Sequence, residues 1–88
     1  PYGFKDQMIR SSLSVASNIA EGYEYHNPKE FLRFLRYARG SAAELKTQVF
    51  ILQETYIKLS ELSEIIEQID NVIRQIQGFS NYLKKGIE

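Results

Sequence analysis

The polar residues most able to do chemistry stand in pairs at helical spacing, close to apolar positions of the chain. These candidates are Asn18, Glu21, Ser41 and Glu44. The members of each pair are three residues apart, so they lie on one face of a helix. Two carboxylates could serve as a catalytic acid and base. Because buried polar groups must be hydrogen-bonded, we favour a structural network that joins two helices and fixes their register, with Arg10 or Arg36 as its cation.

Residues that would hold a metal or a cofactor are scarce. There is no cysteine, His26 is the only histidine, and no Glu-x-x-His sequence occurs, which argues against zinc sites and di-iron bundle sites. We find no nucleophile paired with a base and no Gly-rich loop that could cradle a phosphate. The sequence therefore predicts no enzyme activity, cofactor, metal or small-molecule substrate, and His26 is expected to be a surface residue.

Basic residues recur along the middle of the chain. Arg33, Arg36 and Arg39 are spaced by three, so they share one broad helix face, and Lys29 precedes them. Their side chains could neutralise the phosphates of RNA or another nucleic acid, with Tyr37 nearby to stack on a base. The alternative, which we favour, is a solvated face or one that pairs with acidic residues of the same copy or another. Nucleic-acid contact is therefore the second hypothesis.

Length and charge set further bounds. The chain has 88 residues, enough for one domain, and a chain of this size buries only about 60% of its unfolded surface. Eleven basic residues balance eleven acidic ones, whereas a dedicated nucleic-acid binder usually carries a positive excess. No apolar run approaches the roughly 18 residues of a membrane span, and no signal-peptide pattern opens the chain. These features indicate a cytoplasmic protein with no membrane partner.

Glycine and proline divide the chain into three predicted helices, at about residues 4–21, 28–59 and 61–85. Apolar residues recur in each helix at spacings of three and four, and no alternation of the kind found in strands competes. Short connections between long helices make neighbours antiparallel. The predicted fold is all-α, a single antiparallel up-and-down helical bundle over residues 1–88.

Residues typical of helix ends support these boundaries. Gly22 is placed to form a left-handed cap after the first helix. Asn27 can cap the second helix, Pro28 fits its first position, and Glu30 completes a capping box. Ser60 is the expected cap of the third helix.

Apolar residues repeat every seven positions in the second and third helices, as in coiled coils. The second helix has two such series, Phe31, Ala38, Leu45, Leu52 and Leu59, and Leu35, Ala42, Val49 and Tyr56. The clearest series of the third helix is Leu62, Ile69, Ile76 and Leu83. Three of every seven positions are apolar in the third helix, which suits contact with two neighbouring helices. Three helices cannot cover stripes this wide. We therefore expect a further helix, or other copies of the chain in a homo-oligomer, to cover the rest.

Small residues interrupt the second helix at Gly40, Ser41, Ala42 and Ala43. Glycine inside a helix costs about 1 kcal/mol relative to alanine. We predict that Gly40 and Ala42 allow close approach of another helix, and a simple kink is the alternative.

Two segments carry a family resemblance. They are Ser14-Val15-Ala16-Ser17-Asn18-Ile19-Ala20-Glu21-Gly22 and Gly40-Ser41-Ala42-Ala43-Glu44-Leu45. They match the Ser-x-x-x-Asn-Ile-Ala-Glu-Gly and Gly-Ser-x-x-Glu-Leu hallmarks of the four helix bundle protein family, also called the 23S rRNA intervening-sequence protein family. The chain resembles this family over nearly its whole length.

The resemblance implies a bacterial up-and-down four-helix bundle that assembles into a ring, commonly a pentamer, with no established activity. Some members are encoded inside intervening sequences of 23S ribosomal RNA genes. A related, more basic branch serves diversity-generating retroelements and binds nucleic acid. Members usually begin with another long helix, which we expect to be absent from these 88 residues.

Overall fold

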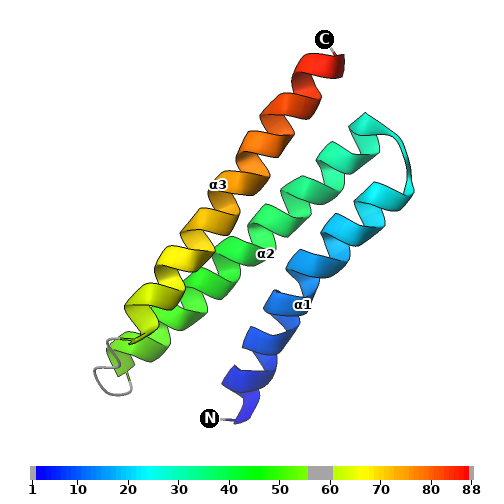
Figure 1. Ribbon diagram of the computed structural model, residues 1–88. Helices are drawn as coiled ribbons and strands as arrows, with labels where there is room; N and C mark the ends of the chain where they lie inside the picture. The colour runs from blue at the N-terminus through cyan, green and yellow to red at the C-terminus, as the bar shows by residue number, and fades with distance from the viewer. Residues whose placement is uncertain (1, 56–60, 88) are drawn as a thin grey trace.

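The computed structural model describes residues 2–55 and 61–87, and nearly all of them are helical. The helices are α1 (Tyr2–Glu24), α2 (Pro28–Thr55) and α3 (Glu61–Ile87). They run up, down and up (Figure 1). The described residues contain no strand, so the all-α prediction is confirmed.

The three helices form an open layer with α2 in the middle. Both α1 and α3 pack on α2, and α1 does not pack on α3 (Figure 1). The layer measures 47 × 22 × 13 Å between Cα atoms, so it is thinnest in the direction across the layer. The sequence predicted two neighbours for α3. Within one chain α3 has a single neighbour, and part of its apolar stripe faces open space.

The heptad residues of α2 and α3 build the core between these two helices. Leu35, Ala38 and Ile76 form one buried cluster. A second buried cluster joins Ala42 and Val49 of α2 to Leu62 and Ile69 of α3. The seven-residue spacing keeps these side chains on the facing stripes of both helices, which is why α3 follows α2 along its whole length.

The first helix is longer than predicted, because Gly22 does not end it. Helix α1 continues to Glu24, and no glycine among the described residues has a positive φ. His26 takes the left-handed conformation instead, with φ of 50°, and it is exposed as predicted. A Cβ at Gly22 would lie 2.7 Å from Cβ of Phe34 and 3.0 Å from Cδ1 of Phe31. Gly22 is therefore needed for close packing of α1 on α2.

The predicted cap of α2 is present. The Asn27 side-chain oxygen accepts hydrogen bonds from the backbone N–H groups of Lys29 (3.0 Å) and Glu30 (3.2 Å). The described residues show no bond from the Glu30 carboxylate back to Asn27, so the second half of the capping box is missing. The predicted end of this helix at residue 59 and the Ser60 cap lie outside the described residues. Helix α3 runs two residues past its predicted end at residue 85.

Candidate functional site

Polar side chains link α1 to α2 by two hydrogen bonds, and Asn18 of α1 bonds to one of the serines that make them. The Ser11 hydroxyl donates to Oε1 of Glu44 at 2.9 Å, and the hydroxyls of Ser14 and Ser41 lie 2.7 Å apart. The Asn18 amide donates to the Ser14 backbone oxygen at 2.8 Å and to its hydroxyl at 3.0 Å. Serine is short enough to let the two helix backbones come close, and its hydroxyl still finds a partner. We call these five residues the polar seam.

The polar seam contains three of the four predicted network residues, namely Asn18, Ser41 and Glu44. Glu21 is exposed and makes no side-chain hydrogen bond within the described part of the chain. Ser11 and Ser14 were not among the residues predicted for the network. Their spacing gave a signal, because Ser11, Ser14 and Asn18 lie three and four residues apart on one helix face. Ser11 is the most buried polar residue, at 4% exposure.

The predicted cations of the network lie elsewhere. Neither Arg10 nor Arg36 bonds to the polar seam among residues 2–55 and 61–87, and both are exposed. Glu44 is also exposed, and its carboxylate accepts from a serine hydroxyl. The Ser11–Glu44 bond places a carboxylate next to a hydroxyl, but Ser11 is only 4% exposed, so its hydroxyl is closed to a substrate. These bonds are suited to setting the register of the two helices.

Basic side chains gather in a groove between the first half of α2 and the end of α3. One hollow of about 80 Å³ is lined by Arg36, Arg39 and Lys84, with Leu32, Leu35, Gln77 and Ser80. A neighbouring hollow of about 290 Å³ is lined by Lys29, Arg36 and Lys84, with Leu32 and Ile87. We call the two together the basic groove. It contains three of the four predicted basic residues and adds Lys84, which lies about fifty residues further along the sequence.

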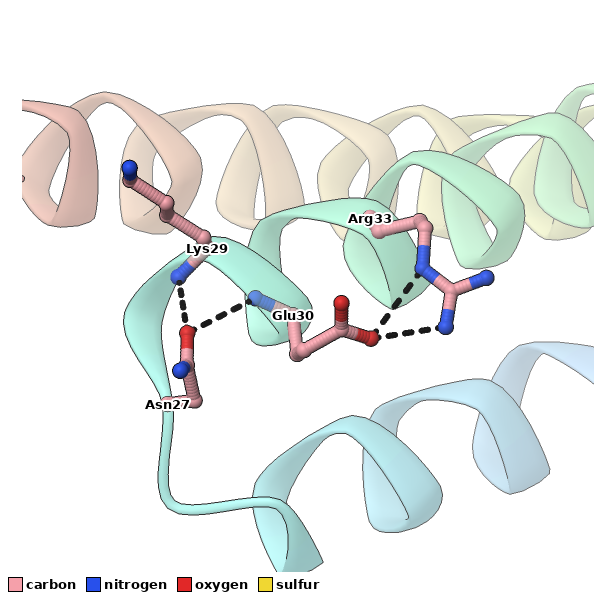
Figure 2. Close-up of polar contacts among 4 residues, drawn as sticks. All are labelled: Asn27, Lys29, Glu30 and Arg33. Atoms are coloured by element: carbon pink, nitrogen blue, oxygen red, sulfur yellow. Dashed lines mark hydrogen bonds and ion pairs between the residues drawn. The ribbon is translucent and has the colours of Figure 1, made fainter.

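Arg33 is separated from the basic groove by its own contacts. Its Nη2 lies 2.7 Å from Oε2 of Glu30, and its guanidinium carbon is 4.8 Å from the centre of the Phe34 ring and 5.8 Å from that of Tyr37. Figure 2 shows the Arg33–Glu30 pair, with the Lys29 side chain pointing away from it. The hydrogen bond to Glu30, followed by the contact with Tyr37, raises the pKa of the Arg33 guanidinium above its ordinary value.

A second, apolar groove lies between α1 and α3 and has α2 as its floor. Two hollows of about 780 and 260 Å³ share Ser12, Leu45, Ile65 and Ile69. Met8 and Ile9 line the α1 wall, and Leu62 and Val72 extend the α3 wall. We call this the apolar groove. It is the open side of the layer that the wide apolar stripes predicted.

The small residues of α2 have two different surroundings. Ala42 is 2% exposed and lies in the core with Val49. In contrast, apart from its chain neighbours and the adjacent backbone of its own helix, no described atom lies within 4 Å of a Cβ built on Gly40. The close contact predicted for Gly40 is therefore not made within one chain, and it stays a prediction for contact between copies.

Across residues 2–55 and 61–87, His, Asp and Glu side chains nowhere gather in threes that could hold a metal ion. In the same ranges, no helix is long and apolar enough to cross a membrane.

Comparison with known proteins gives one match. A family model described as 23S rRNA-intervening sequence protein matches residues 1–78, which include the polar seam and all the residues that line the apolar groove. No curated protein and no solved structure matches the chain.

Proposed function

The chain belongs to the 23S rRNA-intervening sequence protein family, and we propose that it is a non-enzymatic bundle protein whose copies associate through the apolar groove. One observation carries this proposal: the groove is lined on all three sides by large apolar side chains, and in the single chain it is open to water. A ring of five copies, as the family resemblance implies, is the form of assembly that we propose.

The exposure of individual residues supports association. Ile9 on the α1 wall is 47% exposed and Ile65 on the α3 wall is 41% exposed, although both face the same groove. Contiguous apolar surface of this kind on a soluble domain marks an interaction site. Covering it with an apolar helix face of another copy removes that surface from water, at a gain of roughly 25 cal/mol per Å².

A matched pair of charged variants tests the proposal. Ile65→Lys places a charge in the apolar groove. Ile51→Lys places the same charge on α2 at a position that is 45% exposed and lines neither hollow of the groove. Sedimentation velocity should show that Ile65→Lys dissociates to smaller species, whereas Ile51→Lys keeps the mass of the unaltered protein.

The opposite result identifies the other face. If Ile51→Lys dissociates the assembly and Ile65→Lys does not, copies meet on the face of α2 that points away from the groove. Gly40→Leu refines that outcome, because Gly40 has open space around it. Loss of assembly in Gly40→Leu would place Gly40 between copies, and an unchanged mass would rule that position out.

Nucleic-acid binding is the second candidate function. The observation that favours it is the basic groove, where side chains from two helices meet and none of the described lining residues is acidic. Fluorescence anisotropy with labelled RNA at low and moderate salt tests this function, because phosphate contacts weaken steeply as salt rises. Absence of binding at low salt would reject it.

A further inference from the structure

The net charge of zero conceals a separation of charge along the molecule. One end consists of residues 15–40 and 76–87, where six residues are basic and three are acidic. The other end consists of residues 2–14, 41–55 and 61–75, where four are basic and seven are acidic. Two contacts show how α2 and α3 align along the molecule. Arg39 meets Gln77 within the first end, and Lys46 meets Asp70 within the second.

Salt prevents the acidic end from cancelling the basic one. The molecule is 47 Å long, so the middles of the two ends are on the order of 20 Å apart. The Debye length at 0.1 M salt is about 10 Å, and interactions over twice that distance are largely screened. A polyanion at the basic end therefore meets a local positive potential, which the whole-chain charge does not describe.

The cations of the basic groove are available to such a polyanion. Among the described residues, the ion pairs are Arg33 with Glu30 and Lys46 with Asp70, and neither involves a groove residue. Arg39 bonds to the neutral amide oxygen of Gln77. Lys29, Arg36, Arg39 and Lys84 thus line one groove with their charges uncompensated within the described part of the chain.

The shape and lining of the groove indicate what it recognises. Lys29 and Arg39 are ten residues apart, which is about 15 Å along a helix and longer than a single phosphate group. None of the described residues that line the groove is aromatic, so these residues offer no platform on which a base could stack. Tyr37, whose place in the sequence suggested stacking on a base, packs against Phe34 with ring centres 5.9 Å apart.

We propose that the basic groove binds the phosphate backbone of nucleic acid without reading its base sequence. Lys84 of α3 completes the site with Lys29, Arg36 and Arg39 of α2, and Arg33 is not part of it. Contacts to phosphates fix position on a nucleic acid but carry no sequence information, whereas base edges and stacked bases do. This inference rests on the second candidate function and specifies its site and its mode of recognition.

Matched double variants of the full chain test the site. Arg36→Ala/Lys84→Ala removes two charges from the groove, and Arg10→Ala/Arg74→Ala removes two charges outside it. The probe is a labelled single-stranded RNA of about 20 nucleotides, long enough to cover the groove. Anisotropy titrations over a range of salt concentrations give the slope of log K against log salt, and circular dichroism checks the helix content of each variant.

The unaltered protein should give a slope of about −3, since each cation on a single strand contributes about −0.7. The groove variant should give about −1.5 and bind more weakly, whereas the control variant should keep the original slope. Two RNAs of different base sequence should bind with equal affinity.

Other outcomes overturn the proposal in distinct ways. Equal losses in the two double variants would keep nucleic-acid binding but reject the groove as its site. A strong preference for one RNA sequence would reject backbone recognition. A fall in mass of the groove variant with unchanged RNA binding would show that the groove holds the acidic end of another copy. No binding by the unaltered protein at low salt would reject the second candidate function itself.

Discussion

The two contacts of α2 use different chemistry. Towards α3, heptad residues such as Leu35 and Ile76 pack into apolar clusters, and polar contacts such as Lys46 with Asp70 lie at the rim. Towards α1, the polar seam crosses the contact, and Gly22 brings the α1 backbone close to Phe34. The first contact depends on apolar volume, whereas the second depends on short side chains and hydrogen bonds that allow one register.

This difference explains what the family hallmarks do in the structure. The Ser14–Gly22 segment and the Gly40–Leu45 segment face each other across the polar seam, through Ser14 and Ser41. A slide of α1 along α2 by one turn would break all of these bonds and would push Gly22 away from its aromatic neighbours. We infer that the hallmark residues in these contacts pair α1 with α2, whereas Glu21 of the first hallmark is exposed and takes no part.

Removing volume from the contact with α3 should have the largest effect. Leu35 is 2% exposed and belongs to a buried cluster with Ala38 and Ile76. Leu35→Ala should lower the free energy of unfolding by about 3 kcal/mol, because the thin layer leaves few atoms that could fill the cavity. Urea unfolding followed by circular dichroism measures this change. A loss below about 1 kcal/mol would mean that this contact is not a packed core.

Adding volume to the contact with α1 should have the next largest effect. Gly22→Ala puts a Cβ 2.7 Å from Cβ of Phe34, and overpacking of this kind costs roughly 1–3 kcal/mol. Alanine also favours a helix by about 1 kcal/mol over glycine, so we expect a net loss of about 1 kcal/mol.

The matched control for this change is Gly40→Ala, where the new Cβ meets open space in the single chain. It should raise the free energy of unfolding by up to about 1 kcal/mol through helix propensity alone. If Gly22→Ala and Gly40→Ala change the free energy of unfolding in the same direction, the close contact of Gly22 with Phe34 does not limit stability.

A hydrogen bond of the polar seam should have the smallest effect. Ser11→Ala removes a buried hydroxyl that donates to Glu44, and we expect a loss of about 1 kcal/mol. Ser17→Ala is the control, since Ser17 is exposed on the same helix, lines neither groove and makes no side-chain hydrogen bond within the described part of the chain. It should change the free energy of unfolding by less than about 0.5 kcal/mol. Equal effects of the two changes would argue against a role for the seam in stability.

Much of the fold follows from short-range sequence patterns. The heptad series predicted the helices and the residues of the core, and Asn27 with Pro28 predicted the start of α2. The end of α1 did not follow, because Gly22 fits both a left-handed cap and a close helix contact. Only the position of Phe34 on the neighbouring helix decides between these two roles.

The candidate sites were predicted only in part, for a related reason. The spacing of Arg33, Arg36 and Arg39 placed them on one broad face, but the Glu30 carboxylate one turn away binds Arg33. Lys84 joined the basic groove through the packing of α3 on α2, which no local pattern in the sequence reports. Sequence periodicity predicts which residues share a helix face, but it does not predict which residues of two different helices come into contact.

The central claim is that other copies of the chain cover the apolar groove. The most direct test is whether the urea midpoint of unfolding depends on protein concentration. Urea unfolding of the unaltered chain should be followed by circular dichroism at protein concentrations that differ by about a hundredfold. Association of folded chains stabilises them by mass action, so the unfolding midpoint should rise clearly with concentration. Identical midpoints at all concentrations, together with a monomeric mass in sedimentation, would contradict the account.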